Sequence, residues 1–396
     1  MQTLLFAALV AAVFSLVLTC VTHLAVRRVL RRVQAPGGKP PISVLKPLCG
    51  LDDGLYENLA SLARQDYPEF ELLFGCQDPE DPALAVARRV QLDFPSCNIR
   101  VISGVQAAGL NPKVKNLATL SRYAKHDLVL VSDSNVRAAV GYLAAMAREL
   151  DDPRVGLVSS LLYGQGESSL GARLDNLHLN SVIVRAVAGA HELSSHPCVI
   201  GKSMLFRRSQ LQSIGGFELV ENVLAEDYVL GRAFAKAGFR VALSPYPIAA
   251  VSASRTMSQF IGRQVRWGQM RRQLVPSLYP FELLLTPIPF LLLALVLTLA
   301  GAAADLTGWL CSAIALGLCL RVGSDAAIAQ RLRGAPLELR DYAAIVLKDV
   351  LLVGIWLIGA VKRSVCWRGN VFSIGAGSEL FPLYSEKPAE QAFERA

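Results

Sequence analysis

Hydrophobic residues concentrate at the two ends of the chain, whereas the middle alternates short apolar runs with amphipathic stretches. Residues 3–26 contain no Lys, Arg, Asp or Glu, and an uncharged run of this length can cross a bilayer as a helix. A second apolar region extends from residue 281 to residue 361. We therefore predict membrane segments at both ends and a globular domain between them.

The second apolar region is interrupted. Residues 283–304 are uncharged, and Pro287 and Pro289 near their start predict a kink where the segment begins. Residues 306–320 are uncharged too, but they are too few to span a bilayer unless their helix continues past Arg321. The number of crossings after the globular domain stays open at this point.

The last apolar segment, residues 343–361, carries the adjacent charges Lys348 and Asp349. Charge inside a membrane indicates function by default, but a helix lying in the interface, or a re-entrant segment, explains the pair equally well. Basic residues on both sides of the segment indicate that both flanks face the cytoplasm. These residues are Arg331, Arg333, Lys362, Arg363 and Arg368.

The first apolar run is followed directly by arginines at positions 27, 28, 31 and 32. A cleaved signal peptide has its positive charge before a shorter apolar core. We therefore expect residues 1–27 to form an uncleaved transmembrane anchor, with the globular domain after it in the cytoplasm.

The middle of the chain has the pattern of an α/β domain, in which apolar strands alternate with helical stretches. Such alternation predicts a mostly parallel sheet with helices on both faces. The expected helices lie near residues 54–65, 82–93, 113–124 and 139–150. The expected strands are Ile42–Leu45, Phe70–Cys76, Ile99–Ser103, Leu128–Ser132, Val155–Ser159, Met204–Arg207 and Arg240–Leu243.

Composition agrees with a membrane protein. Of the 396 residues, 53% are hydrophobic and only 18% are charged, whereas about a quarter is usual in soluble domains. This excludes a disordered chain. The net charge of +8 comes with no zinc-finger or RNA-binding motif, so we expect membrane lipids rather than nucleic acid as partners. The eight cysteines show no paired metal spacing.

Acidic residues stand where predicted strands end. Asp78 follows the strand over residues 70–76, Asp133 follows the strand over residues 128–132, and Asp227 precedes a helical stretch. Ligands of such sheets bind beyond the carboxyl ends of the strands. Sugar transfer from a nucleotide needs one carboxylate for the nucleoside, one for a divalent metal on the diphosphate and one as general base. Asp78, Asp133 and Asp227 fit these roles in that order.

Basic residues that could bind phosphate follow the acids. Arg263 and Arg266 share a helix face with Trp267, and guanidinium groups bind phosphate oxygens. The alternative is an interfacial helix with arginines on lipid phosphates and the indole at the headgroups. Lys113 lies at a predicted helix N-terminus, which favours anions, and is a candidate contact of the donor.

A second lysine lies in a tripeptide that resembles the end of a phosphate-binding loop, Gly201-Lys202-Ser203. The motif requires a glycine at position 196, which is His196 here. We therefore exclude a phosphate-binding loop of this type and assign Lys202 no role from the sequence.

Six short motifs occur in order along the middle of the chain: SVLKPLCG (43–50), CQDPEDPA (76–83), GLNPKVKNL (109–117), VSDSNVR (131–137), AEDYVLG (225–231) and RQVRW (263–267). Together they resemble the ceramide glucosyltransferase family, membrane-bound inverting glycosyltransferases of family 21 with a GT-A fold. The resemblance covers residues 42–280, and similar membrane segments flank it.

The resemblance implies transfer of glucose from UDP-glucose to the primary hydroxyl of ceramide, with inversion to β-glucosylceramide. It implies Asp227 as the general base, and Asp133 with Asn135 as ligands of Mg²⁺ or Mn²⁺. Many related enzymes have Asp-x-Asp at this metal position, whereas this chain has one carboxylate fewer. With Lys113, the expected donor-binding residues are Asp78, Asp133, Arg263, Arg266 and Trp267.

The resulting organisation has five parts. They are an N-terminal transmembrane anchor (1–27), a basic linker (28–41), a cytoplasmic GT-A catalytic domain (42–280), a C-terminal membrane region of two to three segments (281–370) and a polar tail (371–396).

Three alternatives remain. The acceptor could be another long-chain lipid alcohol such as a hopanoid, because nothing in the sequence selects the lipid. A processive polysaccharide synthase needs a membrane channel, for which three or four apolar segments are few. A non-catalytic membrane protein that binds a nucleotide would not need all three acids together with the Arg-Trp element.

Overall fold

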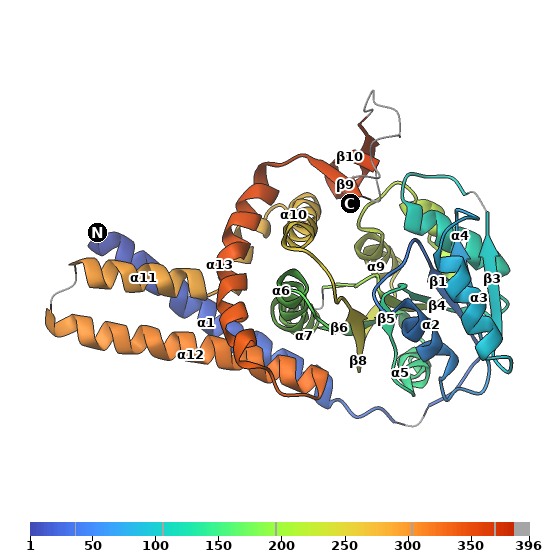
Figure 1. The fold of residues 1–396 in the computed structure, drawn as a ribbon, viewed down its shortest axis with the longest axis horizontal. Helices are drawn as coiled ribbons and strands as arrows, with labels where there is room; N and C mark the ends of the chain where they lie inside the picture. The colour runs from blue at the N-terminus through green and yellow to red at the C-terminus, as the bar shows by residue number, and fades with distance from the viewer. Residues whose placement is uncertain (36, 105–106, 195, 302–303, 368–369, 384–396) are drawn as a thin grey trace.

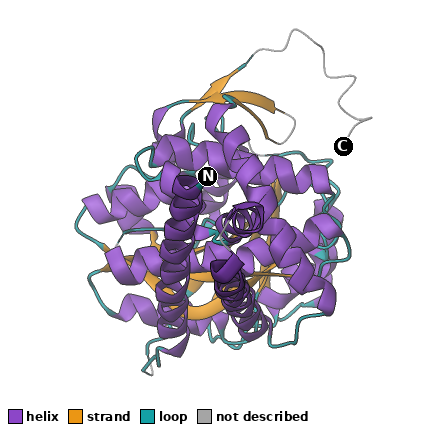
Figure 2. Ribbon diagram, turned by 90° about the vertical axis from the view of Figure 1, so that its left-hand side faces the viewer, coloured by secondary structure: helices purple, strands orange, loops and turns teal. Residues whose placement is uncertain are grey.

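The computed structural model describes residues 1–35, 37–104, 107–194, 196–301, 304–367 and 370–383. The end of the predicted polar tail, residues 384–396, lies outside the described residues. An α/β domain and a bundle of long helices make up the described part (Figure 1). A view turned by 90° shows helices around the strands of the domain (Figure 2).

One mixed sheet of eight strands forms the centre of the domain, in the order β3-β2-β1-β4-β7-β6-β8-β5. Strands β1 to β4 are parallel, whereas β7 is antiparallel to both β4 and β6. The predicted, mostly parallel sheet is confirmed. The strands are β1 (Ile42–Pro47), β2 (Phe70–Cys76), β3 (Asn98–Ser103), β4 (Leu128–Ser132), β5 (Val136–Arg137), β6 (Val155–Gln165), β7 (Ser203–Arg207) and β8 (Arg240–Val251).

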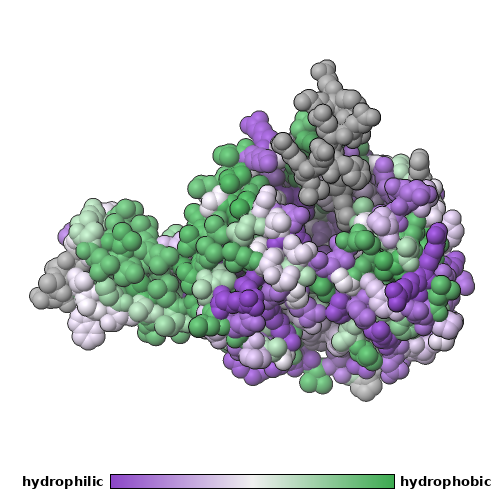
Figure 3. All heavy atoms as spheres, in the orientation of Figure 1, coloured by the Kyte–Doolittle hydropathy of each residue, from purple (hydrophilic) through white to green (hydrophobic). Residues whose placement is uncertain are grey.

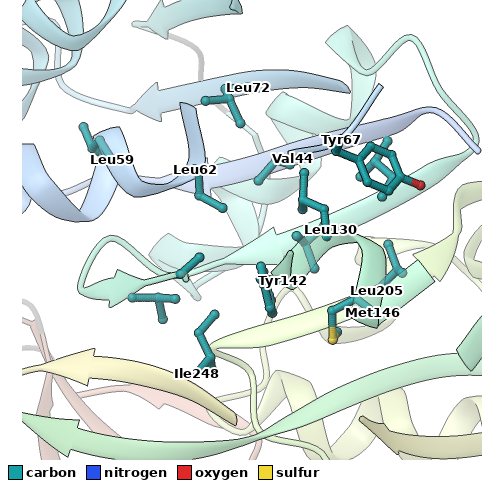
Figure 4. Packing of buried hydrophobic residues seen from close by; sticks show 14 of the residues in the cluster. Val44, Leu59, Leu62, Tyr67, Leu72, Leu130, Tyr142, Met146, Leu205 and Ile248 are labelled. Carbon is teal, nitrogen blue, oxygen red and sulfur yellow. The ribbon is translucent and has the colours of Figure 1, made fainter. Parts of the chain in front are cut away.

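Helices cover both faces of this sheet, as predicted. On one face, α2, α3 and α5 pack on a core that includes Val44, Leu59, Leu130 and Tyr142 (Figure 4). On the other face, α4, α8 and α9 cover a second core, which includes Phe206. These helices are α2 (Leu55–Ala63), α3 (Ala83–Asp93), α4 (Pro112–Tyr123), α5 (Tyr142–Arg148), α8 (Arg208–Ser213) and α9 (Glu226–Lys236).

Three further helices, whose packing could not be predicted from the sequence, join the domain to the membrane segments. They are α6 (Leu170–His178), α7 (Val184–Ser194) and α10 (Met257–Leu274), and a π-helical turn over Leu179–Ile183 links α6 to α7. Helix α7 contacts α1 (Gln2–Arg31), and both α6 and α10 contact α13 (Leu339–Val361).

Three described helices are long and apolar enough to cross a membrane: residues 2–31, 306–333 and 339–361. The predicted kink is confirmed, since the turn over Tyr279–Leu285 and helix α11 (Ile288–Gly301) are bent by 71°. Helix α12 (Ala304–Arg333) continues past Arg321 and so reaches spanning length. Hydrophobic side chains gather over the projecting end of this bundle (Figure 3).

Helices α1, α11 and α12 lie side by side, with Ala8, Leu291 and Ile314 packed in one cluster. Helix α13 instead runs across their direction along the domain (Figure 1). Both of its ends are attached there. Asp341 pairs with Arg173 of α6 at one end, and Gln269 of α10 donates to the Lys362 carbonyl at 3.0 Å at the other.

A buried cluster of five charges ties the domain to α12 and α13. Asp325 accepts from Arg185 of α7 at 2.5 Å and lies 3.3 Å from both Arg321 and Lys348. Asp349 lies 3.0 Å from Arg321 and 2.7 Å from Lys348. Each of these side chains is at most 2% exposed. The adjacent charges in the last apolar segment therefore have a structural role within this network.

We predict that Asp325→Asn destabilises the protein by about 3–5 kcal/mol, because Arg185, Arg321 and Lys348 would then share only one carboxylate in a buried site. The measurement is thermal unfolding of the purified protein in detergent. The control is Asp152→Asn, since Asp152 pairs with Arg154 and Arg240 at the surface, where ion pairs contribute little. Equal shifts of the unfolding temperature in both variants would contradict the prediction.

Candidate active site

Asp133 lies at the carboxyl end of β4, as predicted, between two lysines. Its Oδ1 is 2.9 Å from Lys113 Nζ, and its Oδ2 accepts from Lys202 Nζ at 3.1 Å. Burial raises the pKa of the Asp133 carboxyl, but the two ammonium groups outweigh burial and hold it well below its usual range. Asp133 is therefore an anion that already has cationic partners.

Lys113 occupies the first turn of α4, and the predicted helix N-terminus is confirmed. Asn111 caps the helix, since its side chain accepts from the backbone N–H groups of Lys113 and Val114 at 2.9 and 3.1 Å. The Lys113 ammonium also lies 2.8 Å from Glu226 Oε1 and donates to the Gly201 carbonyl at 2.8 Å. Burial lowers its pKa, but the surrounding carboxylates raise it overall.

Asp227 is the second residue of α9, on the same side of the sheet. Its Oδ2 accepts from the Gly201 N–H at 2.5 Å, and its Oδ1 accepts from the Tyr228 N–H at 2.8 Å. Burial, together with the negative charge of Glu226, raises the pKa of the Asp227 carboxyl to about 6. A carboxyl group with this pKa can accept a proton near neutral pH.

Gly201 permits this close approach. A Cβ at this position would stand 2.9 Å from Asp227 Oδ2 and 3.0 Å from Lys113 Nζ, so a larger residue would require these side chains to shift. Position 201 therefore fits glycine because two groups of the site, Lys113 and Asp227, converge on its backbone.

The start of α9 is held by a small C-terminal sheet of β9 (Ser364–Trp367), β10 (Asn370–Ile374) and β11 (Leu380–Pro382). Ser378, in the turn between β10 and β11, accepts from the Ala225 N–H through its hydroxyl at 3.0 Å. Its carbonyl accepts from the Leu224 N–H at 2.9 Å. This contact, which no sequence motif indicates, fixes the backbone just before Glu226 and Asp227.

Lys202 is a site residue that the sequence reasoning missed. Its ammonium donates to Asn135 Oδ1 at 2.6 Å as well as to Asp133. Burial lowers the pKa of Lys202, the Asp133 carboxylate opposes this shift, and the positive charge of Arg263 adds to it. The tripeptide 201–203 was the only signal in the sequence, and it lacks the rest of the phosphate-loop motif.

Asp78 lies apart from this group, in the exposed turn after β2. Its Oδ1 accepts from the Glu80 N–H at 2.9 Å. The neighbouring Asp81 accepts from the Gly50 and Ala83 N–H groups and so holds the start of α3. Strand β1 lies between β2 and β4, and all three strands are parallel. Asp78, after β2, therefore stands at the same edge of the sheet as Asp133, after β4. Its contact with a nucleoside stays a prediction.

Arg263, Arg266 and Trp267 lie together on α10. The Arg263 guanidinium is stacked 4.3 Å from the centre of the Trp267 ring, which confirms the shared helix face for these two residues. Arg263 also pairs with the fully buried carboxylate of Asp175 on α6, as does Arg255 at 3.3 Å. Arg263 therefore has an internal anionic partner, and its contact with the donor stays a prediction.

A cavity of about 860 Å³ lies beside α10 and the end of α13. Neither Asp133 nor Asp227 is among its lining residues. The loop after β1 contacts the cavity and the end of β4: Asp53, which lines the cavity, accepts from Ser254, and Asp52 accepts from Ser134, the neighbour of Asp133. Residues that line it include Asp53, Arg255, Ile261, Arg263, Val265, Arg266, Ile358 and Lys362.

The predicted metal ligands meet at one point, since Asp133 and Asn135 both contact Lys202 Nζ. Within the described residues, no group of three or more His, Cys, Asp or Glu side chains is placed to hold a metal ion. A divalent cation at Asp133 and Asn135 would therefore need further oxygens from a ligand.

Comparisons with known proteins show which proteins this chain is similar to. The family model "Glycosyl transferase family 21" matches residues 5–380. Ceramide glucosyltransferase 3 of Caenorhabditis elegans is 25% identical over 360 residues, which cover 90% of this chain and 77% of that protein. Ceramide glucosyltransferase 1 of the same organism is 30% identical over 259 residues, which cover 65% of this chain and 55% of that protein.

A solved structure shares the fold. It is a mannosyltransferase from Pyrobaculum calidifontis in complex with GDP-Man and Mn²⁺, which matches 91% of this chain and 99% of its own with a TM-score of 0.56 at 18% identity. The expected GT-A-like fold, a mixed and mostly parallel sheet with apolar helices at both ends, is confirmed.

Proposed function

The chain belongs to glycosyl transferase family 21, and on that premise we propose that it transfers glucose from UDP-glucose to the primary hydroxyl of ceramide. One observation carries the proposal: Lys113 joins the anion Asp133 to the start of α9, where Asp227 has a pKa of about 6. A fixed ammonium group beside a base suits a reaction in which a diphosphate leaves and a hydroxyl is deprotonated. The named relatives support ceramide as the acceptor.

The reaction uses these groups in one displacement. The acceptor hydroxyl oxygen forms a bond to the anomeric carbon from the face opposite the diphosphate, while Asp227 takes the hydroxyl proton. The bond from the anomeric carbon to the phosphate oxygen breaks, and its electron pair leaves with UDP. Attack from the opposite face inverts the anomeric centre and gives the β-linked glucolipid.

The donor's diphosphate would lie near Asp133, with Lys113 as a cation beside it. Asp78 would bind the uridine from the turn after β2, and Arg266 would reach the donor from α10. The oxygens of Asp133 and Asn135 fit one divalent cation, Mg²⁺ or Mn²⁺, because they converge. Such a cation would neutralise the charge that develops on the diphosphate as UDP departs.

The acceptor would come from the membrane side, through the cavity beside α10. Ile261, Val265 and Ile358 give this cavity an apolar wall, and α13 runs along the domain there (Figure 1). We propose that α13 lies in the interface rather than across the bilayer, since both of its ends are attached to the domain.

The domain would then face the cytoplasm. The basic end of α1 is attached to it, because Arg32 donates to the Leu243 carbonyl at 2.9 Å. The basic end of α12 is attached too, through the ion pair of Arg333 with Glu167 at 2.7 Å. Basic residues at membrane ends favour the cytoplasmic side.

To test the reaction, we would measure UDP release by the purified protein in detergent from UDP-glucose, UDP-N-acetylglucosamine and UDP-galactose, each with and without ceramide. We expect ceramide-stimulated release from UDP-glucose. Asp227→Asn should bind UDP normally and lose about 10²–10⁴-fold in turnover, as expected for a missing general base. The matched control is Asp66→Asn, since Asp66 is exposed and away from the site.

Each other outcome changes the proposal in a different way. Stimulated release from another sugar nucleotide would overturn the donor, and release that ceramide does not stimulate would overturn the acceptor. Normal turnover by Asp227→Asn would overturn the base.

We predict that turnover falls as the pH drops through about 6, because Asp227 acts as a carboxylate and its pKa is about 6. Glu226→Gln removes the neighbouring negative charge, so the pKa of Asp227 should fall and the acid limb should move to lower pH. The measurement is kcat between about pH 5 and 8. The control Glu218→Gln, on an exposed residue, should leave the limb in place. An unmoved limb in Glu226→Gln would contradict the assignment.

We predict that sealed membrane vesicles with the cytoplasmic face outward transfer glucose from added UDP-glucose without detergent, because the charged donor does not cross the bilayer. Vesicles of the opposite orientation should need detergent. If instead the vesicles with the cytoplasmic face outward need detergent for activity and the opposite vesicles do not, the domain lies on the non-cytoplasmic side of the membrane.

A further inference from the structure

Lys202 stands where a bound cation would stand. Its Nζ lies 3.1 Å from Asp133 Oδ2 and 2.6 Å from Asn135 Oδ1. The two oxygens come from one strand end, and both point to the same ammonium group. An ammonium group has three donors and no acceptor, so it satisfies these oxygens as a metal ion would.

The sheet fixes this lysine in place. Strand β7 is the antiparallel neighbour of β4, with Ser203 opposite Ser132. One residue further, the Asp133 N–H donates to the Lys202 carbonyl at 3.3 Å. The Lys202 side chain is only 15% exposed. Lys202 therefore reaches Asp133 because of strand register, not because a mobile surface chain happens to fold back.

A metal ion and this ammonium group exclude each other. Mg²⁺ takes its oxygen ligands at about 2.0–2.1 Å in a near-octahedral arrangement. Such an ion on Asp133 Oδ2 and Asn135 Oδ1 would overlap the volume that Lys202 Nζ fills. Binding of the ion therefore requires the Lys202 side chain to turn away.

The charges of the site determine when a divalent cation can replace the Lys202 ammonium group. Lys113 and Lys202 face the carboxylates of Asp133, Glu226 and Asp227. With all five groups ionised, these two positive and three negative charges leave one net negative charge, so a divalent cation would make the site net positive while the displaced ammonium group stays nearby. A diphosphate brings negative charge that offsets the ion and also offers oxygens to the displaced ammonium.

We propose that Lys202 holds the place of the divalent cation while no donor is bound, and gives it up when a nucleoside diphosphate arrives. Divalent cation binding then depends on the nucleotide. The inference rests on the proposed function for the identity of the diphosphate. Beyond the proposed function, it assigns Lys202 the role of controlling when the divalent cation can bind.

The test is direct measurement of Mn²⁺ binding to the full-length protein in detergent, from the electron paramagnetic resonance signal of free Mn²⁺, with and without UDP. Samples with UDP are corrected for Mn²⁺ bound by UDP itself. The variants are Lys202→Met, Lys202→Gln and Lys202→Arg, and the matched control is Lys236→Met, at an exposed lysine of α9. Lys202→Gln covers the case in which Lys202→Met fails to fold.

The wild-type protein and Lys236→Met should bind Mn²⁺ weakly alone and much more tightly with UDP. In Lys202→Met and Lys202→Gln, Mn²⁺ should bind at least about tenfold more tightly without UDP, because a competing charge is gone, and UDP should add less. Lys202→Arg should stay as weak as wild type. Unchanged Mn²⁺ affinity in both neutral variants overturns the proposal.

Failure of the proposed function has a different signature. The Mn²⁺ affinities would follow the expected pattern, but no UDP would be released from UDP-glucose with ceramide. Conversely, normal UDP release with unchanged Mn²⁺ affinities would overturn only the role of Lys202.

Discussion

The candidate active site depends on one ammonium group, that of Lys113. It lies against Asp133 at the end of β4, Glu226 at the start of α9 and the Gly201 carbonyl before β7. Without a cation at this point, the carboxylates of Asp133, Glu226 and Asp227 would repel one another. The Lys113 ammonium group therefore stabilises the meeting of four segments that are distant in the sequence, and the Asn111 cap fixes the first turn of α4 that places it there.

A second ionic constraint sets where this site stands relative to the membrane helices. Asp325 of α12 binds Arg185 of α7 and so joins the bundle to the domain without exposing charge. Together with α13, which is attached at both ends, this holds α10 and the cavity that it lines beside the apolar helices, whose hydrophobic side chains are seen in Figure 3. A reaction between a water-soluble donor and a lipid acceptor needs a site at the boundary between water and membrane, because the donor is soluble only in water and the acceptor only in the membrane.

The sequence was sufficient to predict secondary structure, because strands and helix starts depend on hydrophobic periodicity and on neighbouring residues. The strand over residues 128–132 and the turn to Asp133 follow from an apolar run and an acid, and the start of α4 follows from Asn-Pro. Partners across the fold were not predictable. Lys202 reaches Asp133 through the register of β4 and β7, and Asp175 meets Arg263 through packing of α6 on α10. Strand β6 also runs on past residue 159, because β8 pairs with it as far as Gln165.

The departure of the metal motif from Asp-x-Asp fits the same electrostatics. Asn135 offers an oxygen without charge, so Lys113 and Lys202 already nearly neutralise the carboxylates around them. A fourth carboxylate, at position 135, would add negative charge near Asp227 and push the pKa of Asp227 further up, away from the carboxylate form that a base needs. An amide at position 135 thus favours ionisation of Asp227 near neutral pH, and in the proposed reaction a divalent cation would take its remaining oxygen ligands from the diphosphate.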